Sequence, residues 1–151
     1  MATTTIRPAG SNDLDKLLDL LRLLFTIEED FVFSADRQRQ GLEMMLDNDR
    51  GALLVAEQEG LVVGMCTGQL MISTAEGGLS LLVEDVVVSE PWQGKGIGTT
   101  LLNALEEWGR EKKVARLQLL ADRTNNKGLN FYHNRAWQQT ELICLCKHPT
   151  Y

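Results

Sequence analysis

Residues 88–102 read VSEPWQGKGIGTTLL, and this stretch decides the fold. It joins an apolar, strand-like run to a helix-like pattern, with glycine at alternate positions 94, 96 and 98. Backbone without side chains at the start of a helix lets a large anion approach the N–H groups and the positive end of the helix dipole. The stretch therefore predicts a phosphate-binding loop. The alternative is a glycine-rich turn that serves only chain reversal.

The composition is typical of one globular domain. The chain has 151 residues, 44% hydrophobic and 24% charged, with a formal net charge of −6. This length predicts a single domain over 1–151, and the acidic balance with scattered basic residues argues against a nucleic-acid partner. No apolar run is long enough to span a membrane, and the start of the chain lacks a signal-peptide pattern. The three cysteines, Cys66, Cys144 and Cys146, show no zinc-ligand spacing, so we expect reduced strand residues, a cytoplasmic protein and no metal site.

Hydrophobic periodicity predicts the order β-α-α-β-β-β-α-β-α-β, an α/β fold with a mixed, mainly antiparallel sheet flanked by helices. Ser11 or Asn12 is the expected cap of the first helix. The tight hairpin is expected at Glu59-Gly60, inside a run of three antiparallel strands. The expected elements are a strand at 3–7, helices at 12–26 and 35–47, strands on either side of 59–60 and at 79–88, a helix at 97–113, a buried strand at 114–121, a helix at 124–134 and a final strand at 140–147.

The known phosphate-binding patterns do not fit the glycines. A P-loop requires four residues between its glycine and a Gly-Lys-Ser/Thr, which does not occur here. The dinucleotide pattern G-x-G-x-x-G does not fit either, because its third glycine would fall on Thr99 if it began at Gly94 and on Leu101 if it began at Gly96. Asp122, which follows the next expected strand, matches the acid that binds a ribose in such proteins. A nucleotide-binding domain therefore remains an alternative.

Two motifs resemble the GNAT N-acetyltransferases. Q-x-x-G-x-G at 93–98, between a strand and a helix, is similar to that family's acetyl-CoA pyrophosphate loop. NNKGLNFYHNRAW at 125–137 resembles its second signature, in which Asn is followed after six residues by Tyr and then by a small-plus-aromatic pair. Ala136 stands where the family usually has Gly. Because alanine is also small, we expect this difference to cause no loss of function. LVEDVVV and NFYHNRA look closest to the spermidine/spermine-type, small-amine members.

The resemblance implies acetyl-CoA as co-substrate and a set of residues that bind it. Strands on either side of the glycine loop splay apart in the family, and the freed backbone of Val86, Val87 and Val88 pairs with the pantetheine arm. Asn125 matches a position that touches the coenzyme, although an Asn here is equally suited to capping the following helix. The loop residues that would hold the pyrophosphate are Gln93, Gly94, Lys95, Gly96, Ile97, Gly98 and Thr99.

The resemblance also implies the catalytic groups. Tyr132 occupies the position of the general acid, and a phenol, protonated near neutral pH, can donate to a departing thiolate. Glu84 matches the base of the amine-acetylating members, and Asp85 beside it is expected to face the other side of the strand and to hydrogen-bond to structure. The alternatives are a core tyrosine and two carboxylates exposed at the open end of the sheet.

The function expected is direct acetyl transfer from acetyl-CoA to a primary amine of a small molecule or peptide. Glu28, Glu29 and Asp30, beside two phenylalanines, would bind a cationic acceptor, unless they are only a solvated face. A homodimer is the expected assembly. The alternatives are a non-catalytic acyl-CoA-binding module and a nucleotide-binding domain.

Overall fold

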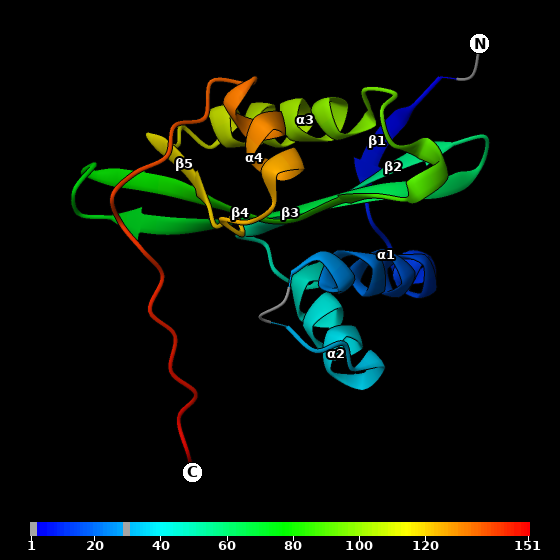
Figure 1. Cartoon of the computed structure of the whole chain (residues 1–151), viewed down its shortest axis with the longest axis horizontal. Coiled ribbons are helices and arrows are strands. Elements are labelled where there is room, and N and C mark those ends of the chain that lie inside the picture. The colour runs from blue at the N-terminus through cyan, green and yellow to red at the C-terminus, as the bar shows by residue number, and fades with distance from the viewer. Residues whose placement is uncertain (1–2, 29–30) are drawn as a thin grey trace. The chain divides into compact units, whose positions relative to one another are not determined.

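The computed structural model describes residues 3–28 and 31–151, which form two packed units divided between Leu119 and Leu120 (Figure 1). The second unit contains one helix, α4 (Asn126–His133). The elements of the first unit are β1 (Thr5–Pro8), η1 (Ser11–Asp13), α1 (Leu14–Ile27), α2 (Ala35–Leu46), β2 (Gly51–Gln58), β3 (Leu61–Ser73), β4 (Gly78–Val88), η2 (Glu90–Trp92), α3 (Ile97–Glu111) and β5 (Arg116–Leu119).

The first unit is built on a five-stranded sheet in the order β1-β2-β3-β4-β5. The first three pairings are antiparallel, and β4 pairs with β5 in parallel. The hairpin between β2 and β3 turns at Glu59 and Gly60, whose φ angles of 52° and 79° are both positive, as a two-residue turn requires. The predicted α/β class, the mainly antiparallel sheet and the hairpin are confirmed.

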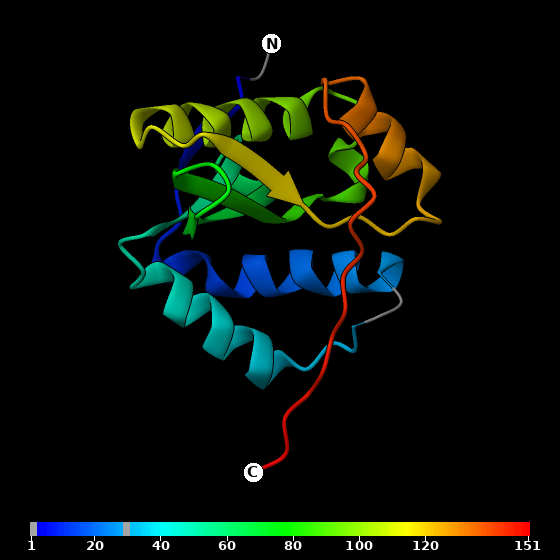
Figure 2. The ribbon, with the colours of Figure 1, turned by 90° about the vertical axis from the view of Figure 1, so that its left-hand side faces the viewer.

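Helices cover both faces of this sheet: α1 and α2 lie on one face and α3 on the other (Figures 1 and 2). The leucines of α1 pack on inward side chains of β2 and β3, including Val55 and Met65, in the main apolar cluster. On the opposite face β3 carries glycines. A Cβ at Gly68 would lie 2.9 Å from Leu105 Cδ1, and one at Gly64 would lie 3.0 Å from Leu101 Cδ1. The missing side chains let α3 pack close to the backbone of β3.

The start of α1 differs from the prediction. Asp13, rather than Ser11 or Asn12, closes the turn, because its Oδ2 accepts a hydrogen bond from Gly10 N at 2.8 Å. The same carboxylate is paired with Arg7, which lowers the pKa of Asp13. An ion pair with a residue of β1 is a tertiary contact, which the local pattern does not reveal.

Two of the predicted strands differ from what the structure shows. The strand expected at 114–121 is only four residues long, and its side chains are half-buried because β5 is an edge strand. The final strand expected at 140–147 is wrong: these residues form no strand and are exposed, so Cys144 and Cys146 do not lie in a strand either. A strand requires a ladder partner, and the strand pairings of the described residues do not include residues 140–147.

Candidate active site

The glycine loop lies between β4 and α3, as predicted. Gly94 and Gly96 have φ angles of 76° and 82°, which glycine adopts without strain. No atom lies within 4 Å of a Cβ built on either residue, so both face open space. Their conformation and open surroundings are what a loop that admits a bulky anion requires.

The first turn of α3 begins at this loop without a side-chain cap. Gly96 is the N-cap and has no side chain to offer the first N–H groups of the helix. Gln93 braces the loop from the other side, because its Nε2 donates to the backbone oxygen of Val88 at 2.9 Å. Lys95 is exposed, with its Nζ 5.1 Å from the ring centre of Trp92. The loop therefore combines a helix N-terminus with a nearby cation.

β4 extends past its partner β5 next to this loop. The parallel pairing runs only from Ser80 to Val83, and β5 ends at Leu119. Residues 84–88 of β4 pair with β3 on one side only. The backbone on the other side is unpaired with any described strand, which is the splay expected between the strands flanking the loop.

A bulge interrupts β4 within this free segment. Between the pairs formed by Glu84 and Val87, two residues, Asp85 and Val86, stand opposite one residue of β3. Asp85 has a φ of 53°, a left-handed conformation that is uncommon outside glycine. Leu81 packs against α3, whereas Val87 packs in the α1 cluster, so the alternation of faces shifts by one residue. Sequence analysis treated Glu84 and Asp85 as ordinary neighbours and missed this bulge, which leaves no local signal.

The two carboxylates at the bulge have different surroundings. Glu84 is exposed, and partial burial of its carboxyl group raises its pKa. Asp85 is mostly buried, which together with the charge of Glu84 raises the pKa of Asp85 to about 6. The buried hydroxyl of Thr67 lies 3.5 Å from Asp85 Oδ2 and 3.0 Å from the backbone oxygen of Glu84. Asp85 thus hydrogen-bonds to structure, as expected, and Thr67 is a residue that sequence analysis missed.

We expect Asp85→Asn to stabilise the protein at pH 7.5 by about 3 kcal/mol and to change its stability little at pH 4. The folded-state pKa of Asp85 is raised, so the unfolded chain loses this proton first and stability falls as pH rises between about 4 and 6. Urea unfolding at both pH values measures the difference. Asp122→Asn is the control and should destabilise the protein at pH 7.5, because the pKa of Asp122 is lowered in the folded state. An equal effect of Asp85→Asn at both pH values would contradict the assignment.

The cysteine beneath the bulge is unsuited to nucleophilic chemistry. Cys66 is fully buried in β3, and its Sγ lies 3.7 Å from the backbone oxygen of Leu101. Burial raises the pKa of Cys66 to about 12, so the thiol stays protonated.

Tyr132 lies in α4, in the second unit, and its ring is half-buried. The rings of Phe131 and Trp137 contact it edge-on, with centroid distances of 5.2 Å and 5.8 Å. Trp137 N also donates to the backbone oxygen of Tyr132 at 3.1 Å. The aromatic residue of the second motif therefore supports the tyrosine ring, a role that sequence analysis did not assign.

Asn125 is the N-cap of α4. Its Oδ1 accepts a hydrogen bond from Gly128 N at 3.1 Å, so the capping alternative is observed. A Cβ at Gly128 would lie 2.6 Å from Asn125 Nδ2, which explains glycine at that position. Asp122, the candidate ribose acid, closes a turn by accepting from the N–H and hydroxyl of Thr124 at 2.8 Å and 2.7 Å.

We expect Ala136→Gly to stabilise the protein by about 1 kcal/mol, because Ala136 has a φ of 67° and a left-handed backbone penalises a Cβ by roughly that amount. The family's usual glycine therefore reflects backbone conformation, and the expectation that alanine is equivalent overlooked it. Thermal or urea unfolding measures the change. Ala104→Gly within α3 is the control and should destabilise by about 1 kcal/mol. A loss of stability in both variants would contradict the explanation.

The acceptor residues proposed from sequence are only partly described. Glu28 follows the end of α1, whereas Glu29 and Asp30 lie outside the described residues. The nearby rings are engaged within the chain: Phe31 stacks on Phe25 at 5.4 Å, and the guanidinium of Arg22 lies 4.4 Å from the ring centre of Phe33. The face of Phe33 is thus covered by a cation of the protein.

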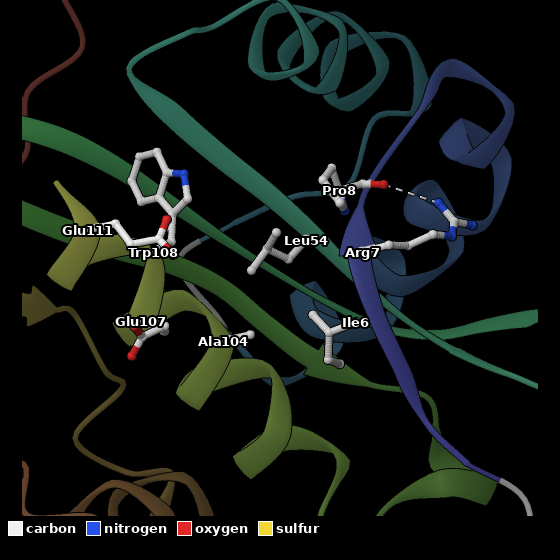
Figure 3. Close-up of a pocket in the computed structure, with 8 residues that line it drawn as sticks. All are labelled: Ile6, Arg7, Pro8, Leu54, Ala104, Glu107, Trp108 and Glu111. Carbon is white, nitrogen blue, oxygen red and sulfur yellow. Dashed lines mark hydrogen bonds between the residues drawn. The ribbon is translucent and has the colours of Figure 1, made fainter.

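A shallow pocket of about 280 Å³ lies elsewhere in the first unit, between β1, β2 and the last turns of α3 (Figure 3). Trp108, Glu107 and Glu111 line it, together with Leu54 of β2 and residues of β1. Trp108 is twelve residues along α3 from Gly96, about 18 Å at the helical rise. The pocket is therefore remote from the glycine loop.

Within 3–28 and 31–151, no three metal-ligating side chains gather at one point. None of the helices in that part of the chain is long and apolar enough to cross a bilayer.

The sequence model of the acetyltransferase (GNAT) family matches residues 14–137. An uncharacterised N-acetyltransferase of Methanocaldococcus jannaschii is 23% identical over 143 residues, which are 93% of this chain and 63% of that protein. One of Archaeoglobus fulgidus is 25% identical over 138 residues, covering 90% of this chain and 94% of the relative. Among solved structures, an aminoglycoside N-acetyltransferase in complex with CoA has a similar fold, with a TM-score of 0.85, 16% identity and coverage of 99% of this chain and 97% of that one.

Proposed function

The chain belongs to the acetyltransferase (GNAT) family and carries its N-acetyltransferase domain, and on that premise we propose that it transfers an acetyl group directly from acetyl-CoA to a primary amine. The observation that carries the proposal is the open glycine loop beside the unpaired end of β4. We retain the prediction of a single domain over 1–151, because the family match spans residues of both packed units. The cytoplasmic location stays a prediction.

The glycine loop suits the diphosphate of the coenzyme, the donor that the family uses. Backbone N–H groups of residues 94–99 are proposed to hold it, because Gly94 and Gly96 leave open space where side chains would otherwise stand. The exposed Lys95 adds positive charge, and Gln93 acts by bracing the loop to β4. Asn125, which caps α4, is proposed to touch the coenzyme as well.

The unpaired side of β4 suits the pantetheine arm. Extended chains bind to free strand edges through backbone hydrogen bonds, so the apolar side chains of Val86, Val87 and Val88 are no obstacle. An N–H of this segment would also stabilise negative charge as it develops on the thioester oxygen. The bulge at Asp85 changes which backbone groups face this edge.

The proposed chemistry needs one base and one acid. Glu84 takes a proton from the substrate ammonium, through a water, so that the nitrogen lone pair becomes available. The nitrogen then forms a bond to the thioester carbon as the carbon–sulfur bond breaks. Tyr132 donates its proton to the departing sulfur and recovers one from the newly bonded nitrogen. The net products are the amide, CoA thiol and one proton.

The acceptor is proposed to be a cationic primary amine on a small molecule or peptide, including the spermidine type. Acids at 28–30 would attract its charge by long-range electrostatics. Phe33 is not proposed to stack on the acceptor, because Arg22 already covers its ring.

The function is tested by mixing the protein with acetyl-CoA and a panel of primary amines while following release of CoA thiol. Turnover with at least one amine is expected. Thermal shifts with acetyl-CoA, NAD and ATP run beside it, because only a ligand of the native state raises the melting temperature. A shift by acetyl-CoA without turnover on any amine would favour the acyl-CoA-binding module. A shift by NAD or ATP alone would favour the nucleotide-binding domain.

We expect Gly96→Ala to weaken acetyl-CoA binding by about 30-fold, because the new methyl group and the strained loop each disturb charge-assisted contacts to the diphosphate. Isothermal titration calorimetry measures the affinity. Gly60→Ala is a matched control: Gly60 has a φ of 79° against 82° for Gly96, and both positions are open. The two variants should lose similar stability, about 1–2 kcal/mol, and only Gly96→Ala should lose affinity. Equal affinities would remove the loop from the coenzyme site.

A further inference from the structure

Thr67 is a buried polar residue in the middle of β3. Only 3% of its surface is exposed, and its register partners are Leu53 on β2 and Glu84 on β4. Valine has nearly the same shape and would gain more from burial, because a buried hydroxyl costs free energy unless it is hydrogen-bonded. The groups that the Thr67 hydroxyl contacts are therefore expected to explain why threonine stands here.

Both of these groups lie at the bulge of β4. Thr67 Oγ1 lies 3.0 Å from the backbone oxygen of Glu84 and 3.5 Å from Asp85 Oδ2. A hydroxyl has one proton to donate, so the shorter distance makes the Glu84 carbonyl its main acceptor. Glu84 is the last residue of β4 in register with β3 before the bulge. The hydrogen bond thus ties the backbone of Glu84 to β3 at the point where the regular ladder is interrupted.

The backbone at this point needs a restraint. After Glu84 the pairing with β3 resumes only at Val87, and the opposite side of the segment is unpaired with any described strand. Asp85 has a φ of 53°, a conformation that is unfavourable for a residue with a Cβ and persists only where surrounding contacts hold it. The hydroxyl of Thr67 supplies such a contact on either side of the peptide bond between Glu84 and Asp85.

We propose that Thr67 is a positioning residue for acetyl transfer, whose hydroxyl fixes the backbone of Glu84 and thereby directs the Glu84 carboxylate toward the acceptor amine. The inference rests on the proposed role of Glu84 as the base. The Glu84 side chain is exposed, so packing restrains it little and the direction of its backbone sets where the carboxylate lies. A base must reach the proton directly or through one water, and a displacement of about 1 Å is costly. Thr67 is too buried to touch a substrate and acts through Glu84.

Thr67→Val tests the proposal, because it removes the hydroxyl and keeps the branching at Cβ. We expect kcat to fall about 10-fold and the affinity for acetyl-CoA to stay unchanged, since a misplaced base slows proton transfer without disturbing the coenzyme. Thr67→Ser keeps the hydroxyl and should recover most of the rate. A lower melting temperature in Thr67→Val with an unchanged kcat would show a purely structural role and overturn the proposal.

Ser80→Ala is the matched control. It removes another buried hydroxyl of the same sheet, at a position of β4 that pairs with Met71 and lies before the bulge, and it should leave kcat unchanged.

A double-mutant cycle with Glu84→Gln shows whether Thr67 acts through the base. In the Glu84→Gln background, Thr67→Val should lower kcat no further. An equal loss with and without the carboxylate would overturn the proposal. Failure of the proposed function would look different, because the wild-type protein would then turn over no amine, or Glu84→Gln would keep the wild-type rate.

The carbonyl carbon resonance of Glu84, measured by NMR in isotope-labelled protein, is a readout that needs neither coenzyme nor acceptor. Accepting a hydrogen bond moves a carbonyl carbon resonance downfield, so Thr67→Val should move this resonance upfield and Thr67→Ser should not. An unchanged resonance in Thr67→Val would show that the hydroxyl does not hold this carbonyl, and it would overturn the proposal whichever function the protein has.

Discussion

Tyr132→Phe is expected to lower kcat by about 1,000-fold and to leave the affinity for acetyl-CoA unchanged. The substitution removes only the hydroxyl that would protonate the departing thiolate, and general acid catalysis contributes roughly 10²–10⁴-fold. The ring itself should keep its place, because its contacts with Phe131 and Trp137 are aromatic. Steady-state kinetics and calorimetric titration of acetyl-CoA separate the two effects.

The sequence offers a matched control for this substitution. Tyr151 is the other of the two tyrosines in the chain and is fully exposed. Tyr151→Phe should retain wild-type turnover and affinity. If Tyr132→Phe kept wild-type kcat, the phenol would be a structural residue and another group would have to protonate the sulfur. A parallel loss of kcat and of melting temperature would point to folding.

Glu84→Gln is expected to lower kcat/KM by about 100-fold at neutral pH and to remove one limb of the pH profile. A carboxylate accepts a proton only when ionised, so activity should rise with pH through the pKa of Glu84. Partial burial raises that pKa, so the limb should lie above the range of a free glutamate, about 4.3. The glutamine variant should keep only the limb that belongs to the amine substrate.

Glu59→Gln, at an exposed position in the hairpin between β2 and β3, is the control and should follow the wild-type profile. Unchanged acetyl-CoA affinity in Glu84→Gln would confine the defect to proton transfer. A glutamine variant with the wild-type rate and acid limb would show that water alone removes the proton.

Local pattern was enough for most of the fold. The 3.6-residue period of leucines predicted α1, and the Glu59-Gly60 pair predicted the hairpin, because each signal lies within one element or one turn. The glycine loop was placed between β4 and α3 for the same reason. Two of its three glycines, Gly94 and Gly96, have positive φ angles, which glycine adopts without strain.

The surroundings of Glu84 and Asp85 could be predicted only in part from the sequence. Glu84 and Asp85 were singled out as charges in an apolar strand, and their different surroundings were anticipated. The sequence did not predict the bulge or the hydrogen bond that the Thr67 hydroxyl makes to Asp85. Both depend on the register of β4 against β3, whose residues lie fifteen or more positions away along the chain. Likewise Ala136 looked equivalent to glycine by size, and only its φ of 67° reveals the difference.

The local spacing of the sequence determined the order of elements through β5 and the place of the glycine loop, whereas the candidate acid and base were predicted from the resemblance to the GNAT family. Tertiary structure alone decided the bulge at Asp85, the early end of β5 and the exposure of residues 140–147. A strand forms only where its backbone hydrogen-bonds to an adjacent strand. Which segments become adjacent is decided by tertiary packing and not by the local sequence.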